Sequence, residues 1–198
     1  NETAGEHFTP RDAVKLLVDL LTANDDDVLT GYPVRTVYDP TAGTGGMLSL
    51  LDERLRRMNP NAEVRLFGQE LNDQSYAICK SELLGKGQAA DGIARGDTLK
   101  NDAHLTERFD YVLSNPPYGG DWKASRTAVE KEIAAGGATN RFPGGTPAIS
   151  DGQMLFLQLV ASKLRPVSEG GGRAGIVLNG SPLFTGGAGS GPSEIRRW

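Results

Sequence analysis

The sequence predicts an α/β fold with a doubly wound, mostly parallel sheet and helices on both faces. Two observations support this prediction. Short β-branched or aromatic runs alternate along the chain with longer segments whose apolar residues recur at helical spacing, and this alternation is typical of parallel βαβ units. Glycines, carboxylates and a proline pair also follow directly after several of these runs, at the strand ends where open α/β sheets bind their ligands.

The expected strands are short apolar runs that stop at a turn, and the expected helices have apolar residues every three or four positions. Along the chain, the strands cover 34–38, 64–70, 93–97, 109–114 and 173–178. The helices cover 13–21, 45–57, 73–84, 128–135 and 151–164, and another begins at 193. Thr9 is expected to cap the first helix with Pro10 in its first turn, and Asn72 or Asp73 to cap the third. The helix over 151–164 is expected to be amphipathic.

Two stretches are expected to be irregular. Residues 24–27 are expected to form an acidic turn that is exposed to solvent. Between residues 119 and 150 the periodicity is poor, and the glycine-rich stretch over 136–145 matches no motif.

Composition limits the function classes. The 198 residues include 21 Lys and Arg against 25 Asp and Glu, a formal net charge of −4, which argues against a domain that holds nucleic acid by bulk electrostatics alone. Cys79 is the single cysteine, so an internal disulfide is excluded, and the two histidines add too few ligands for a zinc-finger-like site. We interpret Cys79 as a small buried apolar residue, and His7 and His104 as ordinary surface residues.

No apolar run approaches the roughly 20 residues that span a bilayer, so no membrane partner is expected. Together with the single cysteine, this favours a cytoplasmic protein. The sequence opens at Asn1 and stops at Trp198 inside a predicted helix. We therefore expect one catalytic domain over residues 1–198, as a piece of a longer subunit.

The first predicted strand is followed by residues 39–46, a turn with three glycines that leads into a helix. Backbone N–H groups in such a turn can approach a ligand closely. The spacing differs from GxGxxG and the turn has no P-loop lysine, so a bound triphosphate is not expected. If the cluster stood alone, a tight strand-to-helix turn without any ligand would be an equally good interpretation.

Carboxylates end the next two predicted strands. Glu70 ends the second strand, and a carboxylate there can accept hydrogen bonds from both hydroxyls of a ribose. Asp97 ends the third strand and could accept a hydrogen bond from the exocyclic amino group of an adenine. Either residue alone could equally be a solvated loop carboxylate or a helix cap. Together with the glycine turn, they indicate a pocket for an adenosine-bearing ligand without phosphates.

The fourth predicted strand runs into Asn115-Pro116-Pro117-Tyr118, and this tetrapeptide indicates the chemistry. Two prolines remove two N–H donors and stiffen the backbone, which leaves carbonyl oxygens free to face a site. The Asn115 amide oxygen and the Pro116 carbonyl can accept both hydrogens of a planar –NH2 group, which directs the nitrogen lone pair at an electrophile. Tyr118 can stack on the ring that carries the amine. Methylation of a cytosine ring carbon is not expected, because it needs a cysteine nucleophile in this region.

With these motifs in this order, the sequence resembles S-adenosylmethionine-dependent amino-group DNA methyltransferases, specifically the modification subunits of type I restriction-modification systems. The resemblance covers nearly the whole chain, including 5–11, 151–158, 171–178 and 183–187, and implies their Rossmann-like class I methyltransferase fold. The cofactor-binding residues that it implies are Phe8, Thr9, Pro10, Asp39, Pro40, Thr41, Gly43, Thr44, Gly45, Gly46, Glu70, Leu71, Asp97, Thr98 and Asn115. The catalytic residues that it implies are Asn115, Pro116, Pro117 and Tyr118.

The resemblance implies methyl transfer from S-adenosyl-L-methionine to the N6 amino group of adenine in double-stranded DNA, after the base has left the helix. No metal is required for this transfer. The implied partners are DNA and a specificity subunit, and a restriction subunit stays open as a further partner.

Two alternatives also stay open. The first is an amino-methyltransferase that acts on RNA guanine or protein glutamine, because such enzymes carry the same tetrapeptide. The second is a non-catalytic, cofactor-binding subunit of a restriction complex, against which the intact tetrapeptide weighs. Residues 8–10 and the long segment over 119–150 favour DNA as the substrate.

Overall fold

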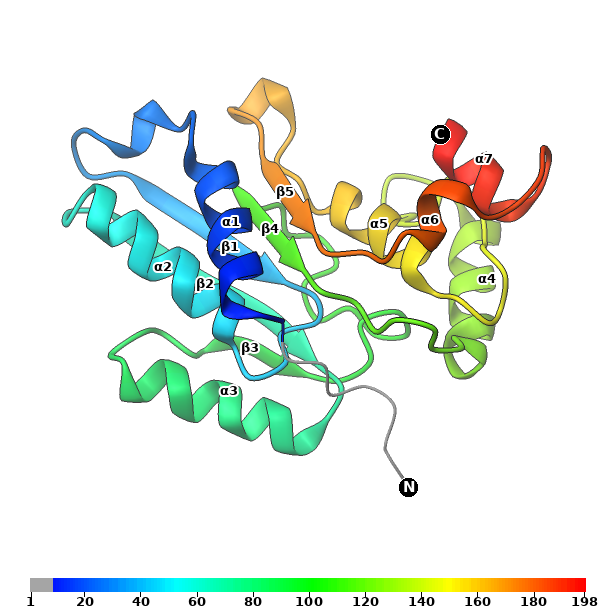
Figure 1. Cartoon of the computed structure of the whole chain (residues 1–198), viewed down its shortest axis with the longest axis horizontal. Helices are drawn as coiled ribbons and strands as arrows, with labels where there is room; N and C mark the ends of the chain where they lie inside the picture. The colour runs from blue at the N-terminus through cyan, green and yellow to red at the C-terminus, as the bar shows by residue number, and fades with distance from the viewer. Residues whose placement is uncertain (1–8) are drawn as a thin grey trace.

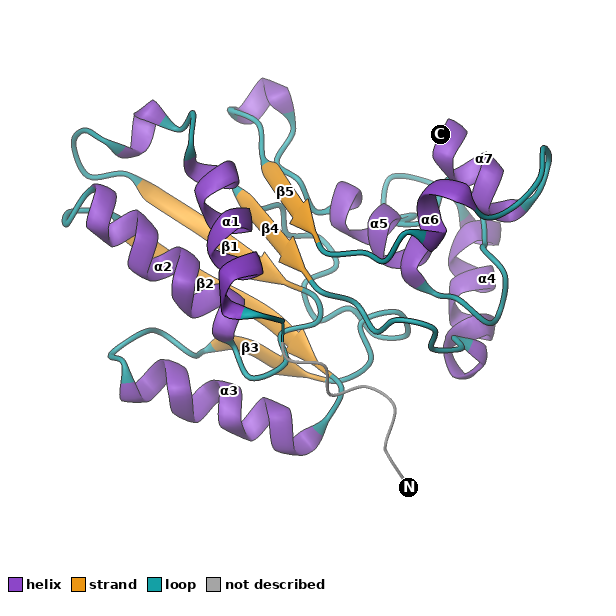
Figure 2. Cartoon of the chain, viewed as in Figure 1, coloured by secondary structure: helices purple, strands orange, loops and turns teal. Residues whose placement is uncertain are grey.

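The computed structural model describes residues 9–198, and its centre is a five-stranded sheet with the order β3-β2-β1-β4-β5 (Figures 1 and 2). All neighbouring strands pair in parallel. The strands are β1 Val34–Asp39, β2 Glu63–Glu70, β3 Gly92–Arg95, β4 Tyr111–Ser114 and β5 Arg173–Ile176. After β3 the chain returns to the other side of β1, so the carboxyl ends of β1 and β4 flank the switch point at which such sheets bind ligands.

Helices lie between the other consecutive strands, as the alternating pattern of the sequence predicts, while residues 96–110 connect β3 to β4 without a helix. The longer ones are α1 Arg11–Thr22, α2 Gly46–Met58, α3 Asp73–Gly85, α4 Arg126–Ala135 and α5 Gln153–Ser162. The short ones are α6 Ser181–Phe184 and α7 Gly191–Arg197, with single 3-10 turns η1 Asp26–Val28, η2 Lys123–Ser125 and η3 Val167–Glu169. Among residues 9–198, no helix combines the length and the apolar composition that crossing a bilayer requires.

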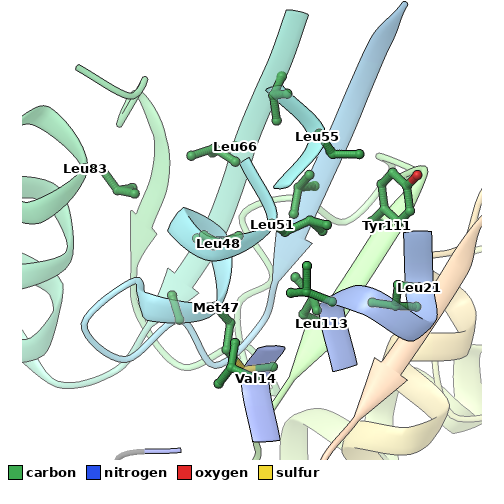
Figure 3. Packing of buried hydrophobic residues seen from close by; sticks show 14 of the residues in the cluster. Val14, Leu21, Met47, Leu48, Leu51, Leu55, Leu66, Leu83, Tyr111 and Leu113 are labelled. Carbon is green, nitrogen blue, oxygen red and sulfur yellow. The ribbon is translucent and has the colours of Figure 1, made fainter. Parts of the chain in front are cut away.

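Alternate residues of the central strands enter two separate cores, one on each face of the sheet. Val37 and Leu113 belong to a cluster completed by α1, α2 and α3, whose packing Figure 3 shows. Tyr38 and Val112, the neighbours of these residues along the same strands, belong to a second cluster completed by α5 and by side chains from 122–142. Helices therefore cover both faces, which confirms the doubly wound arrangement.

Two expectations about the helices are wrong and one is confirmed. Thr9 does not cap α1, because Pro10 occupies the N-cap position and no side chain caps this helix. Asn72 caps α3 as expected, and its side chain accepts a hydrogen bond from the N–H of Ser75. The helix α5 is not amphipathic, since it is packed into the second core with buried residues around most of its circumference.

Two groups that the sequence places at the surface are buried. Asp25, in the turn expected to be solvated, is 8% exposed and its carboxylate pairs with the guanidinium of Arg35 at 3.2 Å. His104 is also 8% exposed, and its ring lies edge-on to the rings of Tyr38 and Phe67, each at 5.5 Å between centroids. Neither environment can be inferred from local polarity, because both depend on contacts with distant strands.

Candidate active site

The carboxyl ends of β1, β2 and β4 bring the glycine turn, Glu70 and Asn115 to one edge of the sheet (Figure 1). The Oγ1 of Thr41, in the glycine turn, lies 2.9 Å from the Oγ of Ser114, the last residue of β4. This hydrogen bond joins the loop after β1 to the residue directly before the tetrapeptide. The first and fourth strand-end motifs of the sequence are therefore parts of one structure.

The glycine turn uses its glycines for conformation and for close approach. Gly43 and Gly45 have φ angles of +54° and +84°, in the left-handed region that glycine tolerates best. A Cβ on Gly45 would lie 2.8 Å from the Sγ of Cys79, so α3 packs directly against the turn. Cys79 is fully buried, as expected, and burial raises the pKa of its thiol to about 12. A Cβ on Gly46 would meet nothing within 4 Å, so the turn is open there.

Glu70 holds the glycine turn in place. Its Oε2 accepts a hydrogen bond from the N–H of Gly43 at 2.8 Å, and its Oε1 accepts one from the N–H of Asn72 at 2.7 Å. Four of the N–H groups expected to face a ligand thus already have partners within the chain, namely those of Thr41, Ala42, Gly43 and Gly45. Each carboxylate oxygen can accept a second hydrogen bond, so Glu70 can still bind two hydroxyls. Leu71, beside it, is 66% exposed at the strand end.

Asp39 and Thr98 contact the protein rather than open space. The Oδ1 of Asp39 accepts hydrogen bonds from the N–H and the Oγ1 of Thr41, at 2.8 and 3.1 Å. Burial raises the pKa of Asp39 to about 7, although these hydrogen bonds oppose the shift. The Oγ1 of Thr98 donates to the carbonyl of buried Pro40 at 2.7 Å. These two side chains can therefore contribute to ligand binding only by fixing the shape of the two loops that contain them.

Asp97 is held on both carboxylate oxygens. Its Oδ1 accepts a hydrogen bond from the N–H of Leu99 at 2.9 Å, and its Oδ2 accepts one from the Oγ of Ser125 at 2.7 Å. Its side chain is 20% exposed, and the Nζ of Lys100 lies 3.8 Å from Oδ2. Sequence reasoning misses Ser125, because it lies in η2, in a segment without any motif. Asp97 retains capacity to accept a further hydrogen bond.

The amide of Asn115 is fixed from two sides. Its Nδ2 donates to the Oγ1 of Thr9 at 2.7 Å, and its Oδ1 accepts a hydrogen bond from the hydroxyl of Tyr118. The same hydroxyl lies 3.2 Å from the carbonyl oxygen of Val177, and burial raises its pKa. One lone pair of Oδ1 stays available for an amine hydrogen. Tyr118 thus orients Asn115, a role that the sequence does not suggest, while its stacking on a ring stays a prediction.

The remaining candidate residues surround this amide and the turn. Pro116 is buried and Pro117 is exposed, while Pro10 is exposed at the start of α1 and Thr44 is half-buried in the turn. Phe8 lies outside the described residues. Within residues 9–198, no group of three or more His, Cys, Asp or Glu side chains is arranged to hold a metal ion.

These groups can bind an adenosine-bearing ligand and orient an amine beside it. The turn is open at Gly46, Glu70 retains acceptor capacity for two hydroxyls, and Asp97 retains it for an amino group. The fixed amide of Asn115 lies on the adjoining loop. The donor and acceptor set therefore fits a nucleoside cofactor without phosphates.

Known proteins with sequences similar to this chain are methylases. A family model described as N-6 DNA Methylase matches residues 1–197. The type I restriction enzyme MjaVII methylase subunit of Methanocaldococcus jannaschii is 30% identical over 185 residues, which cover 92% of this chain and 30% of that protein. The EcoKI methylase subunit of Escherichia coli is 29% identical over 217 residues, which cover 100% of this chain and 35% of that protein. The chain thus spans about a third of the length of these relatives.

Solved structures share the fold. A type I restriction-modification system methyltransferase subunit from Streptococcus thermophilus matches with a TM-score of 0.76 and 26% identity, covering 98% of this chain and 38% of that one. A candidate class I S-adenosylmethionine-dependent methyltransferase from Listeria monocytogenes matches with a TM-score of 0.69 and 17% identity, covering 96% and 50%. The class I methyltransferase fold that the sequence resemblance implies is therefore confirmed.

Proposed function

We propose, since the chain belongs to the N-6 DNA methylase family, that it is the catalytic part of the modification subunit of a type I restriction-modification system. It transfers a methyl group from S-adenosyl-L-methionine to the N6 amino group of adenine in double-stranded DNA. The observation that carries this proposal is the Asn115 amide, held between Thr9 and Tyr118 on the loop beside the glycine turn. A tight turn without catalytic function would not need an asparagine fixed on both sides.

The cofactor supplies an electrophilic methyl group on a sulfonium, and the chain supplies binding and orientation. With the cofactor bound, Glu70 would accept hydrogen bonds from the ribose hydroxyls, Asp97 would accept one from the adenine amino group, and the glycine turn would contact the cofactor. Thr9 and Pro10 line the methionine end next to Asn115. No metal takes part in this scheme.

Asn115 and Pro116 act on the target amine. The Asn115 Oδ1 and the Pro116 carbonyl each accept one of its hydrogens, which directs the nitrogen lone pair along the line of the methyl group. With the cofactor bound, the amine nitrogen would accept the methyl group as the bond from that carbon to sulfur breaks, and one amine proton would then pass to solvent. Tyr118 donates to the second lone pair of Oδ1, so the amide cannot rotate away from the amine.

The substrate and partners follow from the same family. The target adenine must leave the duplex, because its amine is paired there. DNA, a specificity subunit and a restriction subunit are the proposed macromolecular partners, in the cytoplasm. The acidic net charge of −4 supports a division of labour in which another subunit supplies most phosphate contacts.

Methyl transfer from tritiated cofactor tests the proposal. We expect Asn115→Ala to lower transfer to plasmid DNA by about 100-fold or more, because both the acceptor and its orientation are lost, while the cofactor dissociation constant changes by less than about threefold. Tyr118→Phe removes only the hydroxyl, so transfer should fall by about 2- to 10-fold.

Asn61→Ala, at an exposed position between α2 and β2, is the matched control and should leave transfer unchanged. The assay is run with and without a specificity subunit, and with RNA and protein acceptors beside the DNA. Full activity of Asn115→Ala would contradict the mechanism. Label in RNA or protein, or in no acceptor at all, would favour one of the alternatives.

A further inference from the structure

The segment over 122–145 follows the tetrapeptide, and no motif assigns it a role. Trp122 and Phe142, near its two ends, are 4% and 0% exposed and belong to the core on the Tyr38 face of the sheet. The indole N–H of Trp122 also donates to the carbonyl of Ala148 at 3.0 Å. This segment is therefore anchored, in spite of its glycines, and other loops can rest against it.

One contact from this segment reaches Asp97 directly. The hydroxyl of Ser125, which is 5% exposed, donates to the Oδ2 of Asp97 at 2.7 Å. The other oxygen, Oδ1, is held by the N–H of Leu99 at 2.9 Å. The N–H of Lys100 also donates to Oδ1, at 3.3 Å. With donors on both oxygens, the plane of the carboxylate is fixed in the fold.

A second contact holds the loop that carries Asp97. Arg141 is 4% exposed, and its Nη1 and Nη2 donate to the carbonyls of Thr98 and Leu99 at 2.6 and 3.2 Å. Glu132 of α4 pairs with the same guanidinium at 2.6 Å, and Asp102 lies 3.3 Å from Nη1. The planar, forked guanidinium can make all these bonds at once, which a lysine cannot.

The two contacts converge on residues 97–102. Ser125 fixes the side chain of Asp97, and Arg141 fixes the two carbonyls directly after it. Thr98 in turn donates to the carbonyl of Pro40 in the glycine turn. A continuous chain of hydrogen bonds therefore runs from the segment over 122–145 to the glycine turn, through the loop that carries Asp97.

We propose that Ser125 and Arg141 are positioning residues that aim the Asp97 carboxylate at the exocyclic amino group of the cofactor adenine, and so make the site selective for adenine over a 6-oxo purine. This inference rests on the proposed function. Neither residue touches the cofactor in this scheme. The segment over 122–145 forms the rigid support of the part of the site that would bind the cofactor adenine.

Loss of Ser125 should misdirect Asp97 because a competing partner is close. The Nζ of Lys100 already lies 3.8 Å from the Oδ2 of Asp97. Without the hydroxyl of Ser125, the Asp97 carboxylate can turn to this ammonium group, away from the cofactor adenine. The site would then lose both its attraction for an amino group and its repulsion of a carbonyl oxygen.

The test compares binding of S-adenosylhomocysteine and S-inosylhomocysteine to the 198-residue chain by titration calorimetry. The two probes differ only in the amino or oxo group at position 6 of the purine and the adjoining ring proton. We expect the wild-type chain to prefer the adenine probe by about 10- to 100-fold, the range for a hydrogen bond to a charged acceptor. Ser125→Ala should reduce this preference by at least about threefold.

Ser162→Ala is the matched control, because its hydroxyl also makes a 2.7 Å hydrogen bond, to the Leu159 carbonyl on α5, away from Asp97. Its preference should equal that of the wild type. An unchanged preference in Ser125→Ala, with a preference in the wild type, would overturn the inference alone. No preference in the wild type would contradict the role of Asp97 in the proposed function and the inference with it.

Arg141→Lys provides a second, independent variant. It keeps one positive charge beside Glu132 and Asp102 but cannot hold both loop carbonyls. We expect a smaller preference for the adenine probe than in the wild type, measured well below the thermal unfolding midpoint of the variant. A variant that is folded and retains the full preference would remove Arg141 from the inference.

Discussion

Asp39 shapes the glycine turn from a position in which its charge is poorly solvated. The residue is 1% exposed, and its hydrogen-bond donors are the N–H and hydroxyl of Thr41. Burial raises its pKa from 3.8 to about 7. Between these two pKa values, the carboxyl group therefore keeps in the folded state a proton that the unfolded chain has already lost.

This difference predicts a dependence of stability on pH. Because the folded pKa is raised, the free energy of unfolding should fall as the pH rises from about 4 to about 7, and level off above. Between about pH 5 and pH 8 the loss due to Asp39 should be about 2 to 3 kcal/mol. Urea unfolding at both pH values measures this loss. Asp39→Asn cannot ionise at this position, so its free energy of unfolding should not show the part of the loss that is due to Asp39.

Asp12→Asn is the control, because the Asp12 side chain is 97% exposed. This variant should keep the pH dependence of the wild type. Parallel stability curves for the wild type and Asp39→Asn would contradict the raised pKa.

At the residue scale, the sequence identifies the groups that would contact ligands but not the groups that hold them. Asn115, Glu70 and Asp97 can be chosen because each ends or directly follows a predicted strand. Thr9 bonds to Asn115 across 106 positions of the chain, and Ser125 bonds to Asp97 across 28. Such partners depend on the path of the connecting loops, which periodicity does not describe.

The junction between the glycine turn and α2 contains two neighbouring glycines with different constraints. Gly45 has a φ of +84°, and a Cβ there would lie 2.8 Å from the Sγ of Cys79. Gly46 has a φ that other residues adopt, and a Cβ there would meet nothing within 4 Å. The two positions therefore form a natural pair for a substitution experiment.

We expect Gly45→Ala to lower the free energy of unfolding by about 2 kcal/mol or more, through backbone strain and the clash with Cys79. Gly46→Ala should leave stability unchanged or raise it by up to about 1 kcal/mol, because alanine favours the helix. Chemical denaturation measures both effects. Adding Cys79→Ala to Gly45→Ala should recover part of the loss, and equal stabilities of the two single variants would contradict the assigned geometry.

At the element scale, the strands and most helices can be predicted because their apolar periodicity is local. The helix α5 shows where this fails: a helix buried on nearly all sides has no polar face from which its orientation can be read. The strand β4 begins at Tyr111 rather than at residue 109, where Phe109 makes only an isolated bridge to Leu164. A run of apolar residues marks burial, and not the exact extent of strand pairing.

At the scale of the molecule, the segment over 119–150 is the largest part that the sequence leaves unplaced. Trp122 and Phe142 anchor it in the second core, and its other anchors are long-range and polar. The guanidinium of Arg141 lies 3.3 Å from Asp102, and the buried Lys163 of the α5 C-cap pairs with the same carboxylate at 2.6 Å. Buried charges require such partners, but the sequence gives no indication of which carboxylate each cation will meet.

The net charge of the chain predicts how binding and catalysis divide between subunits. With 21 cationic against 25 acidic side chains, the chain lacks the excess of cations that supplies non-specific DNA affinity. The cofactor contacts that we propose, in contrast, are short-range hydrogen bonds to Glu70, Asp97 and the glycine turn. We therefore expect cofactor binding by the chain alone and DNA binding mainly through a specificity subunit.

Fluorescence anisotropy with a short labelled duplex tests this division. The chain alone should bind DNA with a dissociation constant of about 10⁻⁴ M or weaker at physiological salt, the weak end of the non-specific range. Its dissociation constant for S-adenosylhomocysteine should change by less than about threefold between about 50 and 200 mM salt, over which DNA binding by the complex should fall steeply. Tight, strongly salt-dependent DNA binding by the chain alone would instead locate the phosphate contacts within these 198 residues.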